Sequence, residues 1–213
     1  MPDDSVTRPA NLPAFSREST VLRLSSSTSL DDLSPSWAWG GATGKGVRVA
    51  VIDSGIDADH PDLAGCVEVD KGLAVNVDSD GQPADVIGPH GDDFGHGTAC
   101  AGIIHGLAPE ARITSIKVLG GGLTGRAAAF IRGLGWAVDE GFEIINLSLG
   151  ATKREWALPF YEICDRGYFR NSFIVTAASN VGQVSFPSLF ASVASAIIPT
   201  TQTNMKQPMA HWP

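Results

Sequence analysis

The chain has 213 residues, of which 43% are hydrophobic and 18% charged, a balance that suits one globular domain with a sizeable core. A formal net charge of -8 gives no attraction to nucleic acid or to an anionic membrane surface, so we expect neither as a partner. No apolar run reaches the roughly 18 residues of a membrane span. The N-terminus lacks the basic start and apolar stretch of a secretory signal peptide, so we expect a cytoplasmic protein.

Strands and helices are predicted from hydrophobic periodicity. Residues 1–35 are rich in Ser, Pro, Asp and Thr and are predicted to be a partly disordered extension. An Asp-rich segment over 57–93 carries no predicted element. Strands are expected over 47–52, 113–119, 143–149, 173–178 and 193–198, and helices over 96–105, 124–139 and 158–165.

This alternation of strands and helices predicts an α/β fold, a mostly parallel β-sheet flanked by helices on both faces. In such sheets ligands and reactive groups gather at the carboxyl ends of the strands. Asp53 follows the first predicted strand, Ser148 lies near the end of the third, and Ser179 and Asn180 follow the fourth. We therefore expect these side chains along one edge of the sheet.

Three residues near that edge have side chains suited to acyl transfer, and each also has an ordinary structural explanation. The Asp53 carboxylate needs a donor if buried, or it caps the turn that follows. The His96 imidazole can take and return a proton near neutral pH, or it is simply the first residue of a helix. The Asn180 amide can donate to a developing oxyanion, or it shapes a turn.

Four segments around these residues resemble motifs of the subtilisin family (subtilases). Residues 49–56 (VAVIDSGI) resemble its aspartate motif, and residues 95–102 (GHGTACAG) resemble its histidine motif. Residues 145–150 (INLSLG) resemble a wall of its primary specificity pocket. Residues 176–180 (TAASN) resemble its oxyanion motif, with Ser where Gly is usual. The aspartate precedes the histidine, as in the family, and the likeness covers roughly residues 37–196.

The resemblance implies a three-layer fold and a serine-type endopeptidase that acts on peptides or proteins. His96 would be the general base and Asp53 would orient its ring, while Asn180 would donate to the oxyanion. No cofactor is implied. We expect no metal, because the family's calcium-binding insertion after the histidine helix is missing here. Residues expected to contact an extended substrate are Gly120, Gly121, Gly122, Ser148, Leu149, Gly150, Ala178 and Ser179.

One motif of the family is missing from the chain. Its nucleophilic serine lies downstream of the asparagine in a Gly-Thr-Ser-x-Ala-x-Pro-like motif, and residues 181–213 contain none. We expect a partial peptidase domain over 36–198 and a non-family tail over 199–213, from a frameshift, a premature stop or a split gene. The helix face of Ala99, Gly102 and Ile103 would then be bare and would invite a partner.

Two other functions stay open. The chain is alternatively an inactive remnant that binds peptides in the retained groove, or a fragment that a second polypeptide complements by supplying the missing C-terminal segment with the serine. A dinucleotide-binding module is disfavoured, because no GxGxxG follows the first strand.

Overall fold

A computed structural model of the chain describes residues 39–63, 65–120, 125–179 and 183–196. The contacts divide the chain into two units, Met1–Ala42 and Thr43–Pro213. In the first unit the described residues form a turn, which the hydrogen bond from Ala42 N to Trp39 O closes.

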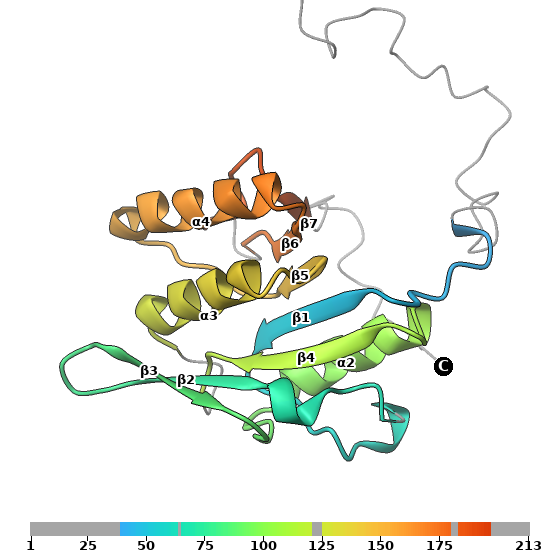
Figure 1. Ribbon diagram of the computed structural model, residues 1–213. Helices are drawn as coiled ribbons and strands as arrows, with labels where there is room; N and C mark the ends of the chain where they lie inside the picture. Colours follow the sequence, from blue (N-terminus) through green and yellow to red (C-terminus); the bar gives the residue numbers. More distant parts are fainter. Residues whose placement is uncertain (1–38, 64, 121–124, 180–182, 197–213) are drawn as a thin grey trace, which may run out of the picture. The chain divides into compact units, whose positions relative to one another are not determined.

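The second unit is built on a mixed, mostly parallel sheet with helices on both faces, as predicted (Figure 1). Strands β2 and β3 pair antiparallel, and the other neighbours pair parallel. The order of the described strands is β3 (Pro83–Ile87), β2 (Leu73–Val77), β4 (Arg112–Lys117), β1 (Arg48–Asp53), β5 (Ile144–Leu147), β6 (Phe173–Ala177) and β7 (Ala194–Ala196). The described helices are α2 (His96–Leu107), α3 (Ala127–Asp139) and α4 (Ala157–Phe169).

Alternation along β1 explains why the sheet is covered on both faces. Successive side chains of a strand point to opposite faces. Val49 and Val51 belong to the apolar cluster that includes Ala101 of α2, whereas Ala50 and Ile52 belong to the larger cluster formed with α3 and α4. A strand that is buried on both faces must be apolar almost throughout, which is the pattern of this run.

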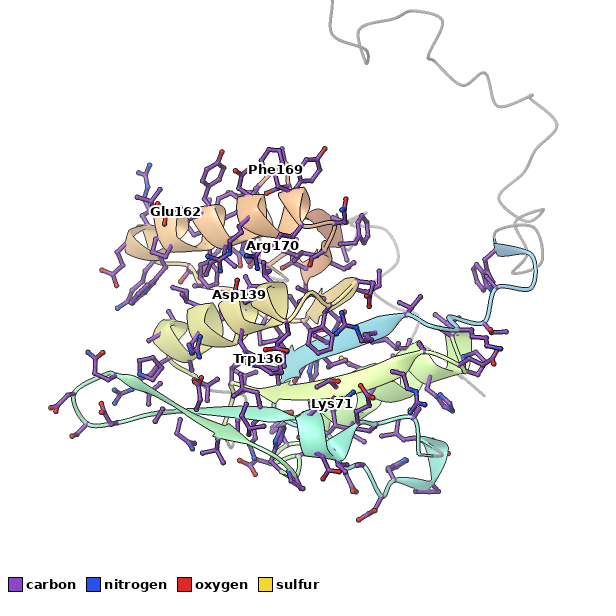
Figure 2. The ribbon with its side chains drawn as sticks, in the orientation of Figure 1. Lys71, Trp136, Asp139, Glu162, Phe169 and Arg170 are labelled. Carbon is purple, nitrogen blue, oxygen red and sulfur yellow. The ribbon has the colours of Figure 1, made fainter. Side chains whose placement is uncertain are left out.

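Helices α3 and α4 lie together on one face of the sheet and are tied at their surface by charges. Asp139 at the end of α3 accepts from Arg170, just past α4, with an oxygen–nitrogen distance of 2.9 Å (Figure 2). Phe160 of α4 is fully buried and meets the ring of Phe130 of α3 edge-on, 4.6 Å between centroids. This contact helps to hold α3 and α4 together on the face of the sheet opposite α2.

Several predicted boundaries were wrong. Residues 57–93 contain the hairpin of β2 and β3, although we predicted no element there. Helix α2 continues to Leu107 and α4 to Phe169, while α3 begins only at Ala127 after its cap at Arg126. Strands β4, β5 and β6 end one or two residues earlier than predicted, whereas β1 ends one residue later, at Asp53. None of the described helices has the length and apolar character needed to cross a bilayer.

Parallel pairing brings the carboxyl ends of neighbouring strands to one edge. In the register of the sheet, Ile52 lies opposite Leu147, and Leu147 lies opposite Thr176. Asp53 and Ser148, each the next residue along its chain segment, therefore come to the same edge, as predicted. Asn180 lies outside the described residues.

Candidate active site

Asp53 and His96 lie in direct contact at this edge of the sheet. The His96 Nδ1–H donates to the Asp53 carboxylate, 2.8 Å from Oδ1 and 2.9 Å from Oδ2. The Asp53 side chain is 1% exposed, and the Ser54 backbone N–H also donates to Oδ1 at 2.8 Å. Both explanations of Asp53 therefore hold, because the same carboxylate caps the turn and orients the imidazole.

Two glycines let α2 approach the end of β1 closely enough for this contact. Gly55 has φ 108°, a conformation that favours glycine. A Cβ atom on Gly97, the second residue of α2, would lie 2.1 Å from the Gly55 carbonyl oxygen and 3.0 Å from the Asp53 Cβ. The absence of a side chain at Gly97 thus sets the separation of the imidazole from the carboxylate.

Asp92 organises the segment that leads into α2, a role the sequence analysis missed. Its Oδ1 accepts from Ser54 Oγ at 2.8 Å and from the backbone N–H groups of Phe94 and Gly95 at 2.9 and 2.8 Å. Its Oδ2 accepts from the backbone and hydroxyl of Thr98 at 2.9 and 2.6 Å. Burial alone would raise the pKa of Asp92, but these hydrogen bonds outweigh it and hold that pKa well below its ordinary value.

Replacing Asp92 by Ala is expected to lower the free energy of unfolding near pH 7 by about 2 kcal/mol, the scale of hydrogen bonds to a charged group. Because the folded-state pKa of Asp92 is depressed, its stabilisation is complete above the ordinary pKa of 3.8 and is lost as the pH falls through the folded-state pKa. Urea denaturation of both proteins at neutral and acidic pH measures the difference, which should shrink in acid.

The matched control for that substitution is Asp93→Ala. Asp93 pairs with Lys117 at 2.7 Å near the surface, and such pairs contribute about 0–1 kcal/mol. An equal loss in the two variants at neutral pH, or a loss for Asp92→Ala that does not depend on pH, would contradict the role given to Asp92.

A cavity of about 790 Å³ opens beside His96. Three of the predicted substrate contacts, Ser148, Leu149 and Gly150, line it together with His96. Apolar side chains from three other segments complete its walls: Leu119, Phe130 and Trp156. His96, a candidate proton acceptor, therefore lies at a cavity that has apolar walls and that the residues following β5 also line.

The other predicted substrate contacts lie elsewhere or outside the described residues. Gly120 lines a smaller neighbouring hollow. The Ala178 N–H donates to Ala196 O at 2.9 Å, which extends the pairing of β6 with β7, and Ser179 Oγ accepts from the Gln183 N–H at 3.3 Å. Gly121, Gly122 and Asn180 are not described, so their roles stay predictions.

Cys100, for which the sequence predicted no role, also lies against the pair. Its Sγ is 3.9 Å from His96 Nδ1 and 3.5 Å from Ser148 Oγ. Burial raises the pKa of the Cys100 thiol, so near neutral pH it is protonated and does not replace a serine nucleophile.

The outer face of α2 is exposed, as predicted. Ile103 is 62% and Leu107 55% exposed, Ala99 is exposed, and a Cβ on Gly102 would meet no atom within 4 Å. This exposed apolar face therefore belongs to the same helix, α2, that begins with His96.

Comparison with known proteins gives one family. The model described as "Subtilase family" matches residues 44–207 and so includes part of the segment predicted as a non-family tail, whose boundaries stay a prediction. Thermitase of Thermoactinomyces vulgaris is 34% identical over 181 residues, 79% of this chain and 60% of thermitase. Subtilisin Savinase of Lederbergia lenta is 35% identical over 175 residues, 77% of this chain and 59% of Savinase.

A solved structure agrees with the fold. The crystal structure of a lanthipeptide protease superposes with a TM-score of 0.60 at 30% identity, covering 72% of this chain and 49% of that protein. The chain spans about 60% of the length of thermitase and of Savinase.

Proposed function

Because the chain belongs to the subtilase family, we propose that it is a serine endopeptidase of the subtilisin type. The observation that carries the proposal is the contact of His96 Nδ1 with both oxygens of the buried Asp53 carboxylate, at 2.8 and 2.9 Å. An imidazole that donates from Nδ1 presents Nε2 as the proton acceptor. The geometry thus supports His96 as a general base at the rim of a cavity.

The proposed reaction is acyl transfer from a peptide bond. As a serine hydroxyl attacks the scissile carbonyl, His96 takes its proton and then passes it to the leaving amine. Asp53 holds the ring in the required tautomer and stabilises the imidazolium that forms. The Asn180 amide is proposed, from its motif, to donate to the oxyanion of the tetrahedral intermediate.

The proposed substrate is an extended peptide or protein segment. Ser148, Leu149 and Gly150 line the cavity beside His96, and the backbone of such a segment can pair with an extended chain as an added strand. The apolar walls at Leu119, Phe130 and Trp156 favour an apolar substrate side chain in the recess. The structural neighbour is itself a peptide-processing enzyme by name, a lanthipeptide protease.

The nucleophile is the one component for which residues 1–213 contain no family motif. We propose that the segment that carries it packs against the exposed face of α2. Ala99, Ile103 and Leu107 present apolar surface there, on the helix that holds His96. This observation favours complementation by another polypeptide as the second candidate, ahead of an inactive peptide-binding remnant.

A fluorophosphonate probe, which reacts with activated serines, tests the proposal on the protein isolated from its host with its bound polypeptides. We expect labelling of a serine in the Gly-Thr-Ser context, and His96→Ala should abolish it. The matched control His60→Ala changes an exposed histidine and should label normally. Labelling of Ser148 or Ser185 would overturn the assignment of the nucleophile but not the proposed serine-peptidase reaction. Peptide binding without any labelling would establish the inactive remnant instead.

A further inference from the structure

Three different metal-ligating side chains converge beneath the cavity. Cys100 follows His96 by one turn of α2, a spacing that puts both side chains on one face of a helix. Its sulfur lies 3.9 Å from His96 Nδ1, and that nitrogen lies 2.8 Å from Asp53 Oδ1. The carboxylate oxygen, ring nitrogen and sulfur all lie within 4.8 Å of one another.

These distances are close to those of a tetrahedral zinc site. Zinc bonds of about 2.0–2.3 Å place neighbouring ligand atoms about 3.4–3.6 Å apart. The observed nitrogen–sulfur distance of 3.9 Å exceeds that range slightly, and the nitrogen–oxygen distance of 2.8 Å falls below it. Small rotations of His96 and Cys100, both partly accessible, would bring the three atoms around one ion.

We propose that Asp53, His96 and Cys100 form a binding site for a thiophilic divalent cation, for which Zn²⁺ is the best match. Thiolate, imidazole and carboxylate are the ligands that zinc combines in proteins, and three protein ligands leave a fourth position for water. Calcium and magnesium prefer oxygen ligands and are disfavoured by the sulfur. On binding, the Cys100 thiol releases its proton to solvent, and the His96 ring stays neutral because its proton passes from Nδ1 to Nε2.

The acidic residues of the β2–β3 hairpin are engaged in other interactions. Asp85 forms an ion pair with Arg132, and the Asp78 carboxylate accepts from the backbone N–H groups of Asp80 and Gln82. Within the part of the chain that the structure describes, the three residues of the proposed site are the group of His, Cys, Asp and Glu side chains that can share one ion.

Zinc binding would make the site a switch, an inference that rests on the proposed function. A cation on His96 Nδ1 occupies the place of the proton that Asp53 accepts, so the carboxylate can no longer stabilise an imidazolium. Binding itself requires no turnover. Its test is therefore independent of whether the chain, alone or with a partner, hydrolyses peptides.

Titration of the chain with Co²⁺, a spectroscopic substitute for Zn²⁺, tests the sulfur ligand. We expect a thiolate-to-cobalt charge-transfer band that one equivalent saturates and that Zn²⁺ removes. Cys100→Ser should abolish the band and weaken Zn²⁺ binding by more than about tenfold, since even partners outside the ligand shell cost that much. The matched control is Cys66→Ser, which should keep the band, because Cys66 is also partly buried but is not among the three side chains of the proposed site.

Alkylation of the unaltered chain gives a second readout that no folding defect can confuse. Zn²⁺ should protect Cys100 from N-ethylmaleimide, while the reaction at Cys66 stays unchanged, as mass spectrometry of the peptides will show. Equal protection of the two cysteines, protection of neither, or a cobalt band that survives Cys100→Ser would overturn the proposal.

Discussion

Replacing Gly97 by Ala is expected to lower the free energy of unfolding by about 3 kcal/mol, the upper part of the usual range for an overpacked core. The added Cβ would lie 2.1 Å from the Gly55 carbonyl oxygen, and a backbone atom cannot rotate away as a side chain can. Relief therefore requires α2 to move away from β1. That movement would also separate His96 from Asp53, so catalysis should fall with stability.

The control lies on the same helix. Gly102→Ala adds its Cβ where no atom lies within 4 Å, so it should gain up to about 1 kcal/mol from helix propensity alone. Urea denaturation followed by circular dichroism measures both variants. If Gly97→Ala were as stable as the unaltered chain, the close approach of α2 to the turn after β1 would be disproved.

The central strands could be predicted because burial on both faces leaves a nearly continuous apolar run. In β1 every residue after Arg48 is buried, and the run ends abruptly at the carboxylate of Asp53. Helix α4 was also predictable, since Phe160, Ile163 and Cys164 recur on one face and all are buried. Where burial determines which residues a segment can carry, the apolar pattern that burial requires can be read from the sequence.

The hairpin of β2 and β3 was missed because its outer strand, β3, is not buried and so has no apolar pattern. All five residues of β3 are exposed, and Pro83 and Asp85 are poor strand formers, so the strand is held by pairing with β2 rather than by burial. The readable signal was the turn between the two strands. Asp80 and Gly81 form a typical hairpin dipeptide, and Gly81 has φ 81°.

Within the site, the sequence predicted residues that belong to strong motifs and missed those defined by spatial approach. Asp53 and His96 were predicted and lie in contact. Asp92 looked like one more carboxylate in an acidic loop, because its five donors come from backbone and hydroxyl groups that no pattern marks. Cys100 had a usable signal, its position one helical turn after His96, but only the fold adds Asp53 to the pair.

Replacing Asp53 by Asn is expected to lower peptide hydrolysis about 10⁴-fold, the effect of this change in serine peptidases of the same catalytic type. The hydrogen bonds around the carboxylate explain the size of the effect. The Ser54 N–H donates to Oδ1, so an amide would place its oxygen there and its NH₂ group at the position of Oδ2. That NH₂ group would face His96 Nδ1 at 2.9 Å and donate to it. The proton would then sit on Nε2, and His96 could not accept one from a nucleophile.

The rate of peptide hydrolysis is measured on the preparation that the fluorophosphonate probe labels. Nitrogen NMR of His96 shows which ring nitrogen carries the proton. Asp59→Asn is the control, because Asp59 is an exposed carboxylate on the turn that follows β1 and should leave both readouts unchanged. A loss below tenfold for Asp53→Asn, with the proton still on Nδ1, would mean that the buried carboxylate only caps its turn. The contact with His96 would then be structural, and the peptidase assignment would lose its strongest support.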